Sequence, residues 1–368
     1  EYHRGTYTTQ SETKRLYRGA EVALQLHEAV RAVCGGAPID AESWQRLAFA
    51  QFHDALPGSS IGVVYEELEK ELAGLAENAR TAAAGELARH GRGRQPIVFN
   101  PTLLPRTAVI EHQGKSHVVR VPGLTSAALR HATAAAAAVR VSGRRLDNGI
   151  VCAEFDAAGQ LEGLAIDGEP LALEGTVGFA LHHDLPASFD AWDIDHYTAR
   201  CGERVAAPLR LQIIERGPLR AVLRGSAPLG ASSRLTVDYI LEAGARHLCL
   251  DVRVAWSEAH RLLRLQVPTA YRGRWARYGC AFGSILRPQL PGVPSDEAQW
   301  EVPGSRWAAV TNEDGTGLAL ISEAKYGFAC RDGNLAVSLL RSPKVPDPQA
   351  DMGEHVIRLA LGRHRAST

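Results

Sequence analysis

The adjacent pair His53-Asp54 stands in the segment FAQFHDALPG, between an apolar, helix-like run and the chain-breaking residues Pro57 and Gly58. This arrangement predicts that both side chains project from the C-terminal end of a helix. A neutral imidazole is a common zinc ligand, and a neighbouring carboxylate can hold a substrate hydroxyl or orient a metal site. A histidine at a helix C-terminus is also favoured by the helix dipole alone. The pair itself leaves both interpretations open.

Two other polar segments could carry chemistry. The opening EYHRGTYTT supplies hydroxyls together with His3 and Arg4, which could line a sugar or phosphate pocket or simply form a polar loop before a helix. The His182–His196 loop, with HHD followed by DAWDIDHY, is rich in potential metal ligands, but it matches neither an EF-hand nor H-E-x-x-H. A solvated loop anchored by Trp192 is the favoured interpretation there. The sequence contains no P-loop, no G-x-G-x-x-G opening a helix and no G-x-S-x-G elbow, which argues against nucleotide binding and serine hydrolase chemistry.

Three amphipathic helices are expected to position these residues. Apolar side chains recur at three- and four-residue spacing over residues 9–34, behind a Thr9-x-x-Glu12 capping-box pattern. A second helix is predicted from an N-cap at Asp40 to Pro57-Gly58, and a third begins after Ser59-Ser60. Short connections between such helices favour a bundle.

The Gly/Arg-rich stretch HGRGRQP at 90–96 marks a change of hydrophobic period, and we interpret it as a linker. Beyond it, runs such as HVVRV, RLTVDYIL and LCLDVRVAW alternate with turn signals such as Asn148-Gly149 and Asp332-Gly333. Period-two runs of this kind predict antiparallel sheets packed face to face. The chain is therefore predicted to be multidomain α+β, mainly helical before the linker and mainly strand after it.

Composition limits the expected partners. The 368 residues carry 41 basic and 41 acidic side chains, so we expect no binding to nucleic acid or to an anionic membrane. Six cysteines without a C-x-x-C pair favour reduced thiols and a cytoplasmic location. No apolar stretch approaches the ~20 residues of a membrane-spanning helix. Because the first residue is Glu1 and the only methionine is Met352, we expect the chain to begin inside a longer polypeptide.

Several motifs occur together in one order. EYHRGTYTTQSETKRLYR and QFHDALPGSSIGVVYEE are followed by VFNPTLLPRTAV, LDNGIVCAEFDAAGQLEGL, DAWDIDHY and YGFACRDGNLAVSLLRSPKVPDPQADMGEH. This series resembles the class II α-mannosidases, glycoside hydrolase family 38. The resemblance implies a three-helix middle domain at 1–92, a small β-domain at 93–146 and a large β-supersandwich of the galactose-mutarotase-like kind at 147–368.

The resemblance also implies site residues. In that family a zinc ion is held by the histidine of a Q-[FH]-H-D motif, together with a His-x-Asp pair and a second aspartate from an N-terminal barrel. His53 would then be a zinc ligand, Asp54 would hold a mannose hydroxyl, and His3 in the H-R-G-T motif would lie along the sugar pocket. Zinc would bind substrate hydroxyls and favour ring distortion, while two catalytic aspartates perform retaining cleavage of the glycosidic bond.

The chain departs from the family pattern in ways that limit its expected chemistry. The family's barrel does not lie within these 368 residues, so we expect the other zinc ligands, the nucleophile and the general acid to lie outside this chain. Since zinc sites take three or four protein ligands, we expect no catalytic residue in this chain and no activity from it in isolation. The final RLALGRHRAST stops where the family's sheet domain would continue, which predicts an unpaired strand. The segment RPQLPGVPSDEAQWEVPGSRWAAV also departs from the family pattern.

We therefore interpret the chain as the middle and C-terminal region of a zinc-dependent retaining α-mannosidase acting on mannose-containing oligosaccharides or glycosides, and a homo-oligomer is compatible with this. The alternatives are a stand-alone carbohydrate-binding β-sandwich with a helical accessory domain, in which His53-Asp54 is only a helix terminus, and a purely structural scaffold. Upstream sequence carrying His-x-Asp and a second aspartate would favour the enzyme. The position of His53 beside the apolar stripe predicts an exposed imidazole surrounded by apolar surface.

Overall fold

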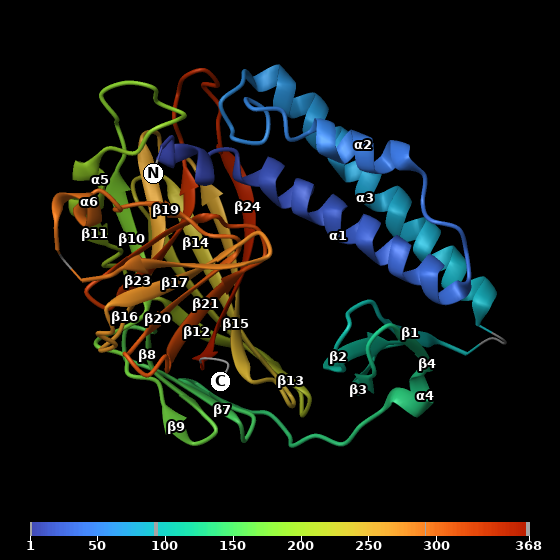
Figure 1. The fold of residues 1–368 in the computed structure, drawn as a ribbon. Helices are drawn as coiled ribbons and strands as arrows, with labels where there is room; N and C mark the ends of the chain where they lie inside the picture. Colours follow the sequence, from blue (N-terminus) through green and yellow to red (C-terminus); the bar gives the residue numbers. More distant parts are fainter. Residues whose placement is uncertain (1, 92–94, 291, 366–368) are drawn as a thin grey trace.

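Two long helices dominate the N-terminal part of the chain. In the computed structural model, which describes residues 2–91, 95–290 and 292–365, α1 (Ser11–Cys34) lies along α3 (Gly62–His90), and the short α2 (Ala41–Phe49) packs beside them (Figure 1). A short 3-10 helix, η1 (Arg4–Tyr7), precedes α1. The three- and four-residue spacing places apolar side chains on the facing surfaces, where they form one buried cluster that includes Ala20, Leu24, Leu47, Leu72 and Ala79.

The predicted end of the second helix is wrong. The predicted N-cap is confirmed, because the Asp40 side chain accepts a hydrogen bond from the Ser43 N–H, but α2 ends at Phe49. His53 and Asp54 therefore lie in a loop of turns between α2 and α3 rather than at a helix terminus. After Phe49 the backbone continues in local turns, in which the N–H groups of Gln51 and Phe52 donate to the carbonyls three residues back.

The predicted capping box of the first helix is also wrong. The helix begins at Ser11, and the Thr9 hydroxyl donates to the Gly5 carbonyl at 2.9 Å instead of capping the helix. Glu12 pairs with Arg15, so it does not reach back to the helix start. A side chain far away in the sequence supplies the cap.

A small β unit follows the helices. Strand β1 (Ile97–Asn100) pairs with β4 (Thr125–Ala128), and β2 (Arg106–His112) pairs with β3 (Lys115–Val121), with the single turn α4 (Leu129–Ala132) beside them. Its core contains Val119, Val121 and Leu129. Within the linker predicted at 90–96, residues 92–94 lie outside the described residues.

Three antiparallel sheets make up the large β unit. One has five strands in the order β5 (Arg140–Ser142), β6 (Arg145–Asp147), β7 (Val151–Phe155), β8 (Leu161–Ile166), β9 (Glu169–Pro170). The nine-stranded sheet runs β12 (Arg210–Arg216), β13 (Arg220–Leu229), β14 (Ser233–Glu242), β15 (His247–Trp256), β24 (Gly353–His364), β21 (Gly317–Ser322), β20 (Trp307–Thr311), β17 (Trp275–Cys280), β18 (Gly283–Pro288). The six-stranded sheet runs β11 (Gly202–Arg204), β10 (Gly178–His183), β16 (Arg261–Pro268), β23 (Asn334–Arg341), β22 (Gly327–Arg331), β19 (Val302–Pro303).

Because apolar side chains alternate along the strands, those on the inward faces fill one extended core between these sheets. Leu235 and Val237 of β14, for example, share a buried cluster with Leu265 of β16 and Val337 of β23. The short α5 (His196–Arg200) and α6 (Pro294–Glu297) are the helices of this unit among the described residues. The predicted change from helix to antiparallel sheet is confirmed.

Both ends of the large unit are paired into its sheets. Strand β5 pairs with β6, and β6 pairs with β7. The expected unpaired last strand is wrong, because β24 is hydrogen-bonded to β15 on one side and to β21 on the other. Over the described residues, no helix combines the length and apolar character needed to cross a membrane.

Candidate functional site

The loop between α2 and α3 presents His53 and Asp54 to solvent. The imidazole of His53 is 77% exposed, and its Nε2 lies 3.3 Å from Oδ2 of Asp54. The other carboxylate oxygen, Oδ1, accepts a hydrogen bond from the Ser59 hydroxyl at 2.9 Å. Asp54 is thus held on one side while its second oxygen faces the histidine, and the predicted exposure of His53 is confirmed.

Buried contacts to α1 fix this loop. The amine of Lys14 donates to the carbonyls of Leu56 at 2.8 Å and Pro57 at 3.3 Å, and also to the carbonyl of Thr9. Burial lowers the pKa of Lys14 to about 7. Gly58 has a φ of 94° and packs so closely that an added Cβ would lie 2.6 Å from the Thr9 carbonyl oxygen. These contacts hold the 56–58 part of the loop against Lys14 and Thr9.

Exposed apolar side chains lie close to the pair along the chain. The Phe52 ring is tilted against that of His53, with ring centroids 4.3 Å apart. Phe49, Phe52, Ile61 and Val63 are all more than half exposed. Exposed apolar side chains gathered around a polar pair are typical of a surface that another domain or ligand covers.

His3 is an exposed residue at the start of η1, before α1. Its backbone is left-handed, with φ 52°, and the hydroxyl of Thr6 donates to its carbonyl at 2.6 Å. Tyr2, His3 and Arg4 line a cavity of about 380 Å³ together with Phe189, Trp192 and Asp193. The predicted residue is therefore at the edge of an aromatic pocket. Among the described residues, no hydrogen bond or ring contact joins His3 to His53 or Asp54.

A fully buried arginine holds the His3 segment in place. Arg341, at the end of β23, pairs with Asp184 at 2.7 Å and donates to the hydroxyl of Thr9 at 3.0 Å. It also donates to backbone carbonyls in the 190–193 segment. Gly5 must be small here, because an added Cβ would lie 2.0 Å from Nη1 of Arg341. A saturated, buried guanidinium therefore links β23 to both loops that flank the aromatic pocket.

The loop after β23 supplies the missing cap of α1. Both carboxylate oxygens of Asp351 accept hydrogen bonds, at 2.8 Å from the N–H of Gln10 and 2.6 Å from that of Ser11. Burial raises the pKa of Asp351. Asp347 in the same loop accepts from the side-chain amide of Gln10 at 2.7 Å. The β-sandwich thus sets the position of α1, and through Lys14 that of the His53-Asp54 loop.

Polar side chains of the His182–His196 loop make hydrogen bonds within the protein. Asp190 accepts from the N–H of Lys344 at 2.6 Å, and Asp195 accepts from that of Ala187 at 2.9 Å. Nδ1 of His182 lies 2.8 Å from the Thr198 carbonyl, and burial lowers the pKa of this histidine to about 4. In the described part of the chain, no group of three or more His, Cys, Asp or Glu side chains could hold a metal ion. These contacts support the loop interpretation.

Sequence reasoning missed Lys14, Arg341 and Asp351. Arg341 and Asp351 both lie in LLRSPKVPDPQADMG, a run in which three prolines follow a strand closely. Such a run predicts a shaped loop, but it does not identify the helix that the loop caps. Lys14 carries no sequence signal of burial, because lysine is almost always exposed in an amphipathic helix.

Comparisons with known proteins cover most of the chain. Residues 146–349 match the family model described as glycosyl hydrolases family 38 C-terminal domain, and residues 1–89 match the α-mannosidase middle domain. Human alpha-mannosidase 2C1 is 30% identical over 400 residues, and a yeast alpha-mannosidase (Saccharomyces cerevisiae) is 26% identical over 403 residues. Each alignment covers 100% of this chain but only 38% of the human protein and 35% of the yeast protein.

Solved structures share the fold. An alpha-mannosidase from Enterococcus faecalis V583 superposes with a TM-score of 0.77 over 99% of this chain and 55% of its own, at 12% identity. A second Enterococcus faecalis structure, a protein in the glycosyl hydrolase family 38, gives a TM-score of 0.73 at the same identity. At this level of identity the likeness establishes the arrangement of helices and sheets and no residue's role.

Proposed function

The chain belongs to glycosyl hydrolase family 38, and from this membership we propose that it forms the middle and C-terminal region of an α-mannosidase that hydrolyses mannose-containing glycosides. Within the chain, the observation that carries this proposal is the exposed His53-Asp54 pair, which the β-sandwich holds in place through α1. The chain spans 38% of the length of its human relative, so the complete enzyme would contribute further residues to the reaction.

Zinc fits the pair as part of a site. His53 offers an exposed imidazole with an adjacent carboxylate, which is a usual ligand environment for zinc. A catalytic zinc site needs three protein ligands, and the described residues offer no such group, so the remaining ligands would come from outside this chain. When bound, zinc would supply a Lewis acid that attracts substrate hydroxyls.

The chain's own residues would bind and orient the sugar. With Oδ1 occupied by the Ser59 hydroxyl, Asp54 would use Oδ2 to accept a hydrogen bond from a mannose hydroxyl. His3 would contact the substrate from the edge of the aromatic pocket. The carboxylates that cleave the glycosidic bond with retention would lie in the remaining part of the enzyme, so we propose that this chain alone is inactive.

The surroundings of the pair support docking of a further domain. The exposed Phe49, Phe52 and Ile61 form apolar surface that such a domain would cover. The cysteines are free thiols, which supports a cytoplasmic location for the enzyme.

Substitutions at the pair in the complete enzyme test this proposal. His53→Ala should lower zinc content and reduce hydrolysis of an aryl α-mannoside by orders of magnitude, because a ligand is lost. Asp54→Asn should keep the zinc and lower kcat/KM by about tenfold to 100-fold, the usual effect of losing a hydrogen bond to a charged group. Metal analysis and steady-state kinetics measure the two effects separately.

The exposed His90 at the end of α3 provides a matched control, and His90→Ala should leave both measurements unchanged. Normal zinc content together with normal turnover in His53→Ala would refute the ligand assignment. In that case the pair would be a surface feature of the loop without a role in the reaction.

A further inference from the structure

The outer face of the six-stranded sheet carries a hollow where two alanines are neighbours. Ala336 of β23 lies opposite Gln266 of β16 on one side and opposite Ala329 of β22 on the other. The alternate residues on these strands, such as Leu265 and Val337, point into the core. Two adjacent methyl side chains leave a depression in the sheet surface, bordered by the longer side chain of Gln266.

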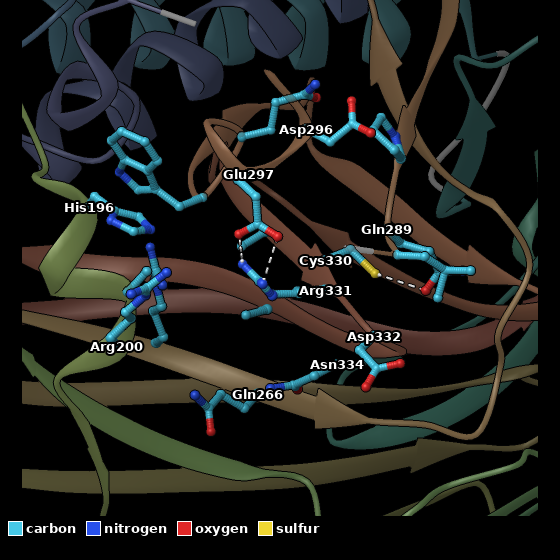
Figure 2. A pocket seen from close by; sticks show the side chains of 18 of the residues that line it. His196, Arg200, Gln266, Gln289, Asp296, Glu297, Cys330, Arg331, Asp332 and Asn334 are labelled. Atoms are coloured by element: carbon cyan, nitrogen blue, oxygen red, sulfur yellow. Dashed lines mark hydrogen bonds and ion pairs between the residues drawn. The ribbon is translucent and has the colours of Figure 1, made fainter. Parts of the chain in front are cut away.

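Two chain segments build walls around this depression. Figure 2 shows His196 and Arg200 of α5 on one side and Glu297, at the end of α6, with Arg331 of β22 on the other. Arg331 and Glu297 form a bidentate ion pair, with nitrogen–oxygen distances of 2.6 and 2.9 Å. The enclosed volume is about 500 Å³, within the ~300–1,000 Å³ typical of small-molecule sites.

Trp300, which also lines the pocket, is held in a fixed orientation. The indole N–H of Trp300 donates to the Ile194 carbonyl at 2.9 Å, and the ring packs on His196 with centroids 5.0 Å apart. The guanidinium carbon of Arg4 lies 3.9 Å from the centre of the Trp300 ring. These contacts make the wall rigid, so the pocket exists without a ligand to shape it.

Several polar groups of the pocket lack protein partners. Oδ1 of Asn334 is buried with no hydrogen-bond partner, and so is Nε2 of His182, which also lines the pocket. Among the described residues, the side chains of Gln266 and Arg200 make no hydrogen bond or ion pair. Buried polar groups are normally satisfied, so the unpartnered Asn334 Oδ1 and His182 Nε2 beside one cavity indicate a polar ligand, while Gln266 and the exposed Arg200 are free to contact it.

The charges of the pocket favour a neutral ligand. Its lining contains three arginines, Arg200, Arg264 and Arg331, and three acids, Asp296, Glu297 and Asp332. Arg264 is paired with the buried Glu301, and Asp332 is paired with Arg272. The lining therefore carries no excess of positive or negative charge that would favour an anion or a cation.

We propose that this pocket binds a neutral saccharide, independently of the zinc assignment at His53. A sugar ring has an apolar C–H face that fits the Ala329–Ala336 floor, and its hydroxyls both donate and accept hydrogen bonds. The amides of Gln266 and Asn334 provide both functions, and Arg200 donates from the wall. The site would add a contact to a glycan chain without taking part in bond cleavage.

Binding of mannotriose to the 368-residue chain tests the proposal. Isothermal titration up to about 10 mM covers the weak affinities expected of a small site. Gln266→Ala and Asn334→Ala should each weaken binding by about tenfold, because each removes one or two hydrogen bonds. Ala336→Leu should abolish binding by filling the floor. Gln212→Ala, at an exposed position on β12, is the matched control and should leave affinity unchanged.

Other outcomes distinguish this site from a sugar site at the His53-Asp54 loop and from an anion site. Loss of mannotriose binding in His53→Ala, with binding retained in Gln266→Ala, would assign the sugar to the His53-Asp54 loop and overturn the proposal. Inorganic phosphate should not compete, and competition that depends on Arg200 would identify an anion site instead. Absence of mannotriose binding to the folded wild-type chain, with folding verified by circular dichroism, would also overturn it.

Discussion

At the scale of single residues, the candidate site depends on close approaches between backbones. Gly58 combines a positive φ with a position against Thr9 that leaves no room for a Cβ. The contact matters because the same loop carries His53 and Asp54 and is held to α1 by Lys14. A glycine before a helix is unremarkable in a sequence, so the requirement becomes visible only in the folded chain.

Gly58→Ala should therefore destabilise the chain by about 2–3 kcal/mol, from backbone strain and the clash with Thr9. Gly74→Ala on α3 is the matched control, since no atom would lie within 4 Å of its new Cβ, and it should stabilise by about 0.5–1 kcal/mol. Denaturant unfolding of the two variants measures both values. Equal effects at the two positions would show that Gly58 is not constrained as described.

At the scale of elements, helix and strand periods were predictable and their ends were not. The stripe that includes Ala20 and Leu24 on α1, and the alternation over Leu235 and Val237 on β14, follow from local spacing, which the sequence contains. The start of α1 instead depends on Asp351, which lies 340 residues from Ser11 along the chain. Local rules cannot identify a partner at that separation.

Removing the cap that Asp351 provides to α1 should measurably destabilise the chain. Asp351→Ala should lower the free energy of unfolding by about 3 kcal/mol or more, because it leaves two buried N–H groups and the neighbouring buried lysines without their carboxylate. Asp40→Ala removes the cap of α2, whose donor is exposed, and should lower the free energy of unfolding by clearly less. Thermal and denaturant unfolding of both variants compare the caps. A larger loss for Asp40→Ala would contradict this account of how α1 is held.

The candidate site shows the same division between local and distant information. Exposure of His53 was predictable, because it lies beside the apolar stripe that ends at Phe52. Its position in a loop was not, because the apolar spacing continues to Phe52 whereas α2 ends at Phe49. The roles of His53, Asp54 and His3 came from motif resemblance and remain proposals.

At the scale of the whole molecule, buried polar groups join the helical unit to the β-sandwich. Lys325, between β21 and β22, donates to the Ser11 hydroxyl of α1 and at 2.6 Å to the Leu339 carbonyl. Lys14, Asp351 and Arg341 lie in the same junction. Such contacts specify one docking geometry, since a shifted helix would leave charged groups buried without partners. The placement of His53 relative to the sandwich depends on this junction.

The junction should make stability depend on pH in a defined direction. Burial lowers the pKa of Lys14 to about 7 and that of Lys325 to about 8, against 10.5 for an ordinary lysine. Above pH 7 the unfolded chain therefore binds more protons at these sites than the folded chain. The free energy of unfolding gains up to about 1.4 kcal/mol per pH unit from each lysine as pH rises from its folded pKa towards 10.5.

Lys14→Met isolates this effect, because it removes one of the two titrating amines while keeping a long side chain in the junction. The slope of unfolding free energy between pH 7 and 8.5 should fall by about 1 kcal/mol per pH unit relative to the wild type. The buried thiols of Cys249 and Cys330, with pKa values raised to about 11 and about 12, oppose the rise only at higher pH and are common to both proteins. Lys115→Met, at an exposed position on β3, should keep the wild-type slope. Equal slopes in wild type and Lys14→Met would mean that Lys14 stays charged in the folded junction, with its three carbonyl acceptors outweighing burial.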